Sequence, residues 1–259
     1  MNFVQKYNYW LFSGVMLVCF LISVGMRYQQ FETWEKNPAA YFVGERPMMT
    51  TLDAPLWLRF AREFNEGVFT KDTQSRLRGY PKSTDEYKKK LANELSVPLK
   101  YTDPLHTYSP SFLSNTSGTK GTSFSDLPFI SFLIANLVPF FNYNYYLTGT
   151  LMIPVMASLF VLPLGIYFFM IGLPLSGLLG GLIGTFASGY YMRSSIGRID
   201  TDMLNLFFPV LSALFIMMAS RAKTDRYIIL YSVISGLSLY LFQWWYNKPS
   251  FIISLFLVF

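Results

Sequence analysis

The chain has 259 residues, of which 52% are hydrophobic and 14% are charged, and its formal net charge is +6. This composition excludes a polar disordered chain and a protein that coats nucleic acid. Residues 127–192, a run of 66, contain no charged side chain, whereas about 20 apolar residues suffice to cross a bilayer as a helix. A soluble globular enzyme is therefore excluded, and we expect an all-α polytopic membrane protein that lies in the lipid bilayer.

The distribution of charge divides the chain into three parts. Residues 1–26 contain one charged side chain, Lys6, and the apolar run Tyr9–Met26 predicts a first transmembrane helix that is not cleaved as a signal peptide. Residues 27–126 contain 14 basic and 12 acidic side chains. This near balance predicts a long external loop and no nucleic-acid partner. Residues 127–259 predict a multi-span transmembrane bundle.

One amphipathic helix can be recognised in the long loop. After Pro55, apolar side chains recur between charged ones, at Leu56, Trp57, Phe60, Phe64 and Val68. This spacing is typical of a helix with one buried face. Asp53 stands two residues before the proline, which is a common N-terminal cap pattern. Capping would explain Asp53 without any further function.

Five apolar segments follow the long loop: Leu127–Asn142, Tyr145–Ile171, Pro174–Met192, Met203–Ser220 and Tyr227–Tyr246. The first has 16 residues and two prolines, which predicts a re-entrant or interfacial helix rather than a span. In that case the long loop and the loop 193–202 lie on one side of the membrane. The basic cluster Arg221, Lys223 and Arg226 then lies on the other side, which the positive-inside rule makes cytoplasmic.

Glycines are concentrated in the segment that starts at Pro174. They form two overlapping Gly-x-x-x-Gly pairs, Gly177 with Gly181 and Gly180 with Gly184. Such pairs let helix backbones approach closely in lipid. We expect tight helix packing here rather than phosphate binding, because no strand or charged partner accompanies the glycines.

The loop 193–202 holds Asp200 and Asp202, two of the three acidic residues after residue 126. Acidic residues beside membrane spans are costly unless they have a partner or a function. Two interpretations remain open. Carboxylates at i and i+2 of an extended chain project to one side and suit a hard divalent cation. Alternatively, Asp200 or Thr201 caps the next helix, whose dipole favours Asp202.

Three other features have simple explanations. His106 is the single histidine and has no cysteine near it, so we do not expect it to bind a metal. The sequence Trp244-Trp245-Tyr246 ends a span and is typical of an aromatic belt. Asn115-Thr116-Ser117 matches a glycosylation acceptor, a short pattern that arises easily by chance. The Lys-rich stretch at residues 88–90 has no explanation.

Residues 188–204, Ser-Gly-Tyr-Tyr-Met-Arg-Ser-Ser-Ile-Gly-Arg-Ile-Asp-Thr-Asp-Met-Leu, resemble the second external loop of the catalytic subunit of oligosaccharyltransferase, closest to the bacterial single-subunit type. In that family an arginine precedes Asp-Thr-Asp-Met-Leu by seven residues, as Arg193 precedes Asp200. Met48-Met49-Thr50-Thr51-Leu52-Asp53 with Ala61-Arg62-Glu63 is similar to the first-loop motif with the family's catalytic aspartate. Trp244-Trp245-Tyr246 with Pro249-Ser250 is similar to a stretch near the fifth span.

The resemblance covers the N-terminal transmembrane part of the family and implies a C-type glycosyltransferase transmembrane fold with a long first external loop. It implies metal-dependent transfer of an oligosaccharide from polyprenyl pyrophosphate to the Asn side chain of an acceptor polypeptide with Asn-x-Ser/Thr. Asp53 and Arg193 would then be catalytic, and Asp53, Asp200 and Asp202 would bind Mg²⁺ or Mn²⁺. The location implied is a bacterial inner membrane, with the active site facing the periplasm.

The chain departs from the family at its C-terminal end, where the last apolar run begins at Phe251 and has nine residues. A later external-loop Glu, an Arg facing the pyrophosphate and a Trp-Trp-Asp-Tyr-Gly motif are absent, so we expect a C-terminally truncated chain that is inactive alone. Two alternatives remain. One is another polyprenyl-phosphate-dependent glycosyltransferase, O-mannosyl or lipid-modifying, against which the Asp-Thr-Asp argues. The other is a transporter, for which the uncharged run offers few polar groups.

Overall fold

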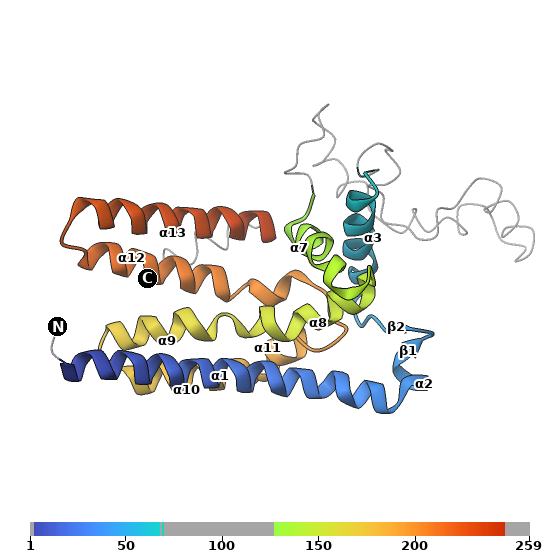
Figure 1. The fold of residues 1–259 in the computed structure, drawn as a ribbon, viewed down its shortest axis with the longest axis horizontal. Coiled ribbons are helices and arrows are strands. Elements are labelled where there is room, and N and C mark those ends of the chain that lie inside the picture. The colour runs from blue at the N-terminus through green and yellow to red at the C-terminus, as the bar shows by residue number, and fades with distance from the viewer. Residues whose placement is uncertain (1–2, 68, 70–126, 247–259) are drawn as a thin grey trace, which may run out of the picture. The chain divides into compact units, whose positions relative to one another are not determined.

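The computed structural model describes residues 3–67, 69 and 127–246 (Figure 1). Most of these residues are helical, which confirms the predicted all-α class; the short strands β1 (Phe42–Val43) and β2 (Arg46–Pro47) pair antiparallel. Within the described residues, four helical segments are long and apolar enough to cross a membrane: Trp10–Lys36, Tyr145–Met170, Thr201–Arg221 and Asp225–Trp245. The protein is therefore a multi-pass membrane protein. The Lys-rich stretch at 88–90, His106, Asn115 and the run from Phe251 lie outside the described residues.

Two units of the chain are described separately, residues 1–61 with 128–259, and residues 62–127. In the second unit the description covers the end of the amphipathic helix, where Arg62 and Glu66 form an ion pair at 3.7 Å. Both side chains are at least half exposed, so solvent screens this pair and it contributes little to stability. The first unit contains all the membrane helices named above.

The first helix, α1 (Phe3–Lys36), continues past the predicted end at Met26. Arg27, which marked that end in the sequence, is fully buried among the other helices of the first unit. The predicted boundary between the first helix and the long loop therefore falls too early. The short helix α2 (Pro38–Tyr41) and the β1–β2 hairpin follow α1.

The predicted amphipathic helix is present as α3 (Ala54–Asn65). The carbonyl of Asp53 accepts hydrogen bonds from the amides of Leu56 and Trp57, at 3.0 and 3.2 Å, so Asp53 stands at the N-cap position. Ala54, Leu58 and Ala61 form the buried face of this helix. Both the helix and the capping position predicted for Asp53 are confirmed.

The short apolar segment after the long loop forms α7 (Phe129–Leu137) and η4 (Val138–Phe141). Together they are too short to cross a membrane, as predicted for a re-entrant or interfacial helix. Ile130, Ile134 and Val138 are fully buried. The hydroxyl of Ser131 donates to the carbonyl of Trp57 in α3 at 2.9 Å, so this segment packs beside the helix that follows Asp53.

The next helices are α8 (Tyr145–Ser158), α9 (Val161–Met170), α10 (Pro174–Phe186) and α11 (Ser188–Arg193). The first two form one span, as predicted, and α10 returns beside α9. The predicted continuous span from Pro174 to Met192 is wrong, because Ala187 has non-helical backbone angles and separates α10 from α11. With 13 residues, α10 is about 20 Å long, shorter than the hydrocarbon core of a bilayer.

Two glycines of α10, Gly177 and Gly181, pack closely against α9. A Cβ atom added at Gly177 would lie 2.9 Å from the Cβ of Phe168, and one added at Gly181 would lie 3.1 Å from Val161. Gly180 has more room, with its nearest neighbour at 3.8 Å. The predicted close packing is therefore confirmed, and Gly177 and Gly181 carry it.

The last described helices are α12 (Phe207–Arg221), which follows η5 (Thr201–Leu204), and α13 (Asp225–Trp245). The pair lies antiparallel (Figure 1) and is joined inside by a hydrogen bond between the hydroxyls of Ser212 and Ser235 at 2.8 Å. In lipid, where apolar contacts drive helix association weakly, such buried hydroxyl pairs help to fix the packing of two helices.

The loop that holds Asp200 and the basic cluster lie at opposite ends of the bundle (Figure 1). Asp200 stands directly before η5, whereas Arg221 ends α12 and donates to the carbonyl of Met170 at the end of α9. The predicted separation of the two groups is therefore confirmed. That the basic end faces the cytoplasm remains a prediction from the positive-inside rule.

Candidate functional site

The acidic loop, residues 194–200, connects α11 to η5 and is hydrogen-bonded to the segment that precedes α3. The amide of Thr50 donates to the carbonyl of Gly197 at 3.0 Å. The hydroxyl of Thr51 donates to the carbonyl of Ile199 at 3.3 Å. These two acceptors lie just before Asp200, and the two donors lie just before Asp53. The structure thus brings together two segments that are separated by almost 150 residues.

Gly197 permits this close approach. Its φ angle is +78°, in the left-handed region that favours glycine. A Cβ atom here would lie 2.5 Å from the ring of Trp34 in α1 and 2.7 Å from the carbonyl oxygen of Met48. Any side chain at this position would push the acidic loop away from α1 and from the segment before Asp53.

Asp200 caps η5, as the capping interpretation predicted. Its Oδ1 accepts a hydrogen bond from the amide of Thr201 at 2.7 Å and a longer one from the Thr201 hydroxyl at 3.4 Å. Within the described part of the chain, Oδ2 makes no hydrogen bond. Capping therefore occupies one carboxylate oxygen and leaves the other available to a ligand.

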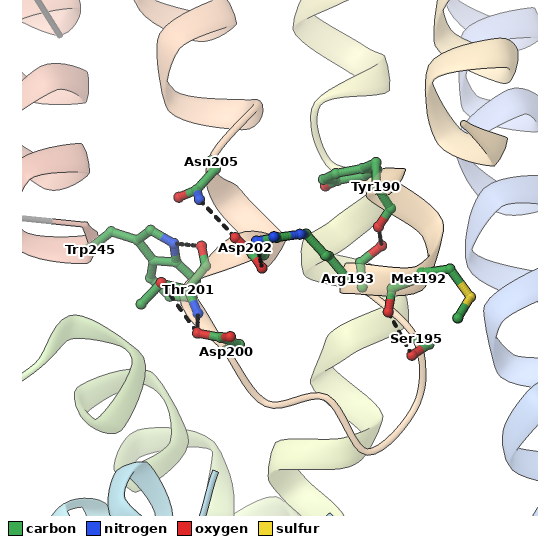
Figure 2. A network of polar contacts seen from close by, with 10 residues as sticks. Tyr190, Met192, Arg193, Ser195, Asp200, Thr201, Asp202, Asn205 and Trp245 are labelled. Carbon is green, nitrogen blue, oxygen red and sulfur yellow. Dashed lines mark hydrogen bonds and ion pairs between the residues drawn. The ribbon is translucent and has the colours of Figure 1, made fainter. Parts of the chain in front are cut away.

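Asp202 is held from two sides (Figure 2). Its Oδ2 lies 3.3 Å from Nη1 of Arg193, and its Oδ1 accepts a hydrogen bond from the side-chain Nδ2 of Asn205 at 3.3 Å. The side chain of Arg193 is 65% exposed and that of Asp202 is 17% exposed. Because the arginine is largely in solvent, this pair contributes at most about 1 kcal/mol to folding. Its effect is to orient the carboxylate.

Asp200 and Asp202 bring two carboxylates to the start of η5, and Arg193 pairs with one of them. Two carboxylates close enough to repel each other form an arrangement that a bound cation would relieve. Carboxylate oxygens are also the ligands that Mg²⁺ and Mn²⁺ prefer. The donor set of Asp200 and Asp202 therefore fits a divalent cation.

Asp53 does not complete a cluster of three ligands in this conformation. Among the described residues, no group of three or more His, Cys, Asp and Glu side chains is gathered closely enough to hold a metal ion. Asp53 and Asp200 are joined through the hydrogen bonds of their neighbours Thr51 and Ile199. Of the predicted site residues, Arg193, Asp200 and Asp202 thus lie together, and Asp53 lies in the adjoining segment.

Trp245 contributes to the site, which corrects the aromatic-belt interpretation. Its side chain is 3% exposed, and its indole N–H donates to the carbonyl of Thr201, between the two acidic residues (Figure 2). Trp244 stacks on Phe129 of α7, with ring centroids 4.5 Å apart. A belt residue would face the membrane interface, whereas Trp245 anchors the start of η5 from α13.

A polar face of α1 is the feature that sequence reasoning missed. Ser23, Arg27 and Gln30 succeed one another at spacings of four and three, so they share one face of the helix. Gln30 donates to the hydroxyl of Tyr191 at 2.8 Å and accepts from the amide of Ile196 at 3.1 Å. The available signal was the helical spacing of these polar residues across the end of the apolar run at Met26, since it predicts a face turned away from lipid.

Comparison with known families places the chain in one family. Residues 124–259, just over half of the chain, match the family described as Oligosaccharyl transferase STT3, N-terminal. The matched region includes α11, the acidic loop and η5, whereas Asp53 precedes it. A search among curated proteins gave no match. The chain belongs to the oligosaccharyltransferase STT3 family of membrane glycosyltransferases.

Proposed function

We propose that this protein acts in metal-dependent N-glycosylation, the transfer of an oligosaccharide from polyprenyl pyrophosphate to the Asn side chain of Asn-x-Ser/Thr in an acceptor polypeptide. Membership of the family supports glycosyl transfer in general. The observation that carries the finer proposal is the pair of hydrogen bonds that holds the segment before Asp53 against the segment before Asp200. Acidic residues from two distant segments can thereby serve one site.

The proposed roles follow from the chemistry of the side chains. Asp200 and Asp202 would hold Mg²⁺ or Mn²⁺, and Asp53 would join them as a ligand and would accept a hydrogen bond from the amide of the acceptor Asn. When bound, the ion supplies positive charge that stabilises the departing pyrophosphate. The amide nitrogen is a poor nucleophile because its lone pair is delocalised, so a carboxylate that holds its N–H groups out of conjugation favours attack. Arg193 holds Asp202 in position.

We further propose that the acidic end of the bundle faces the side opposite the cytoplasm. Arg221, Lys223 and Arg226 at the other end support this orientation. In a bacterium the acidic end would face the periplasm from the inner membrane. Acceptor polypeptides that have crossed the membrane, and a lipid-linked oligosaccharide held in the outer leaflet, would both reach the site from that side.

The test is transfer to a fluorescent Asn-x-Thr peptide by the full-length protein in membranes supplied with lipid-linked oligosaccharide. We expect EDTA to abolish transfer and added Mn²⁺ or Mg²⁺ to restore it. Asp53→Asn should lower kcat by more than about 100-fold, since it removes a charge aimed at the reacting centre. Glu45→Gln, which changes an exposed acid in the turn between β1 and β2, is the matched control and should be unaffected. Transfer that persists in EDTA would refute the metal requirement.

A further inference from the structure

Arg27 is the most unusual charged residue in the described part of the chain. It lies in the candidate span Trp10–Lys36 of α1, directly after the apolar run that ends at Met26, and its relative exposure is 0%. Arginine inside a membrane protein is costly, and such a residue usually has a functional reason to be there. Its partners therefore indicate what it does.

Every described acceptor of Arg27 is neutral. Nη1 donates to the hydroxyl of Ser23 at 2.9 Å, and Nη2 donates to the carbonyl of Thr185 at 3.1 Å and to the hydroxyl of Ser194 at 3.0 Å. The guanidinium also lies over the rings of Tyr190 and Tyr191, 5.7 and 5.2 Å from their centroids. Cation–π contacts of this length attract a desolvated cation. The charge is thus stabilised without an opposite charge among the described residues.

The partners of Arg27 lie on both sides of α11. Thr185 belongs to the last turn of α10, where carbonyl groups lack an amide partner within their own helix. Ser194 is the first residue of the acidic loop, directly after Arg193. A single planar guanidinium therefore bridges the end of α10 and the start of the acidic loop.

Two neighbours of Arg27, Gln30 and Tyr190, make further hydrogen bonds to the acidic loop and to η5. Gln30, nearly one turn further along α1, accepts from the amide of Ile196 in the acidic loop. The hydroxyl of Tyr190 bonds to the carbonyls of Ala157 in α8 and Met203 in η5, at 2.8 and 2.9 Å. The acidic loop and η5 are therefore held to α1 and α8 through Gln30 and Tyr190. Tyr190 also contacts Arg27, and Gln30 follows Arg27 on α1.

We propose that Arg27 is a positioning residue, which fixes α11 and the acidic loop from the interior of α1 and thereby sets the geometry of Arg193, Asp200 and Asp202. This inference rests on the proposed function of those residues. Arg27 touches no reacting group itself. The helix is interrupted at Ala187, and Arg27 links the residues on either side of α11 by hydrogen bonds to Thr185 and Ser194. The acidic loop therefore keeps a fixed position although no continuous helix leads into it.

Three variants of the full-length protein in nanodiscs test this role. Arg27→Met keeps the length of the side chain but removes all donors, Arg27→Lys keeps the charge but loses the bridging fork, and Ser194→Ala removes one acceptor. Ser195→Ala is the matched control, because this neighbouring hydroxyl bonds to the carbonyl of Met192 and not to Arg27. The readouts are amide hydrogen exchange in residues 194–205 and the Mn²⁺ concentration that gives half-maximal transfer.

We expect exchange in 194–205 to accelerate about tenfold in Arg27→Met and Ser194→Ala, since each loses hydrogen bonds to a charged group. The half-maximal Mn²⁺ concentration should rise by a similar factor, with an intermediate value for Arg27→Lys. Exchange in α13 should not change, which separates local positioning from a general loss of stability. Ser195→Ala should resemble the wild type in both readouts.

Unchanged exchange and an unchanged Mn²⁺ requirement in Ser194→Ala and Arg27→Met would overturn the positioning role. If Arg27→Met does not fold, Ser194→Ala decides the question by the same two readouts. A wild-type protein without metal-dependent transfer would refute the proposed function instead. In that case the exchange measurement still determines whether Arg27 fixes the acidic loop.

Discussion

Asp200→Asn is expected to lower transfer by more than about 100-fold while leaving the fold intact. Asparagine caps a helix about as well as aspartate, so the hydrogen bond from the amide of Thr201 to this side chain survives. What disappears is the negative charge that a divalent cation requires. The substitution therefore separates the two interpretations of Asp200, because a residue that only caps η5 would tolerate Asn.

The measurement is transfer to the acceptor peptide by the full-length protein, with membrane insertion checked in parallel. Asp225→Asn is the matched control, since Asp225 is exposed in the first turn of α13 at the other end of the bundle. It should transfer at the wild-type rate. Wild-type transfer by Asp200→Asn would reduce Asp200 to a structural cap and remove it from the proposed metal site.

Gly197→Ala is expected to have the second large effect. Alanine at this positive φ angle is strained, and its Cβ would meet the ring of Trp34 and the carbonyl of Met48 at distances that real contacts do not reach. The backbone strain and the steric clash together are expected to lower the free energy of unfolding by about 2–4 kcal/mol. Because the acidic loop must move to relieve the clash, transfer should also fall, by about tenfold or more.

Thermal unfolding followed by tryptophan fluorescence in detergent, together with the transfer assay, tests this expectation. Gly236→Ala is the control, because Gly236 lies within α13 and a Cβ atom there meets nothing within 4 Å. That variant should be as stable as the wild type or slightly more so, since alanine favours a helix over glycine. A Gly197→Ala protein of unchanged stability and activity would show that the acidic loop does not depend on its contact with α1.

Much of the membrane topology was predictable because lipid imposes simple rules on sequence. Apolar length identified the spans, and the two prolines with the short length of Leu127–Asn142 identified a helix that does not cross. Glycine spacing identified the packing face of α10. Counting crossings placed the acidic loop and the basic cluster at opposite ends of the bundle, which the structure confirms.

The failures have a common physical cause, since each concerns a residue whose environment depends on tertiary partners. We predicted that the first span ends before Arg27, because an arginine after an apolar run normally lies outside the membrane. Its burial depends on Ser23, Thr185 and Ser194, and two of these lie on other elements. Likewise, Trp245 has the composition of a belt residue, but its partner is the carbonyl of Thr201.

The break after α10 was not predictable from hydropathy, because the run from Pro174 to Met192 contains no charge. Apolar composition reports that a segment can enter lipid, but it does not report whether the helix is continuous. The buried carbonyl of Thr185, which lacks an amide partner within α10, accepts a hydrogen bond from Arg27 instead. An interruption of this kind becomes visible only when its remote hydrogen-bond donor is known.

Mn²⁺ binding to the full-length protein in nanodiscs, followed by electron paramagnetic resonance, most directly tests whether Asp53 and the acidic loop form one site. We predict one Mn²⁺ per wild-type chain, with a Kd that rises at least about tenfold in Asp53→Asn and in Asp200→Asn. Asp225→Asn should bind as the wild type does. Unaltered Mn²⁺ binding in Asp53→Asn would contradict a single site built from the two segments.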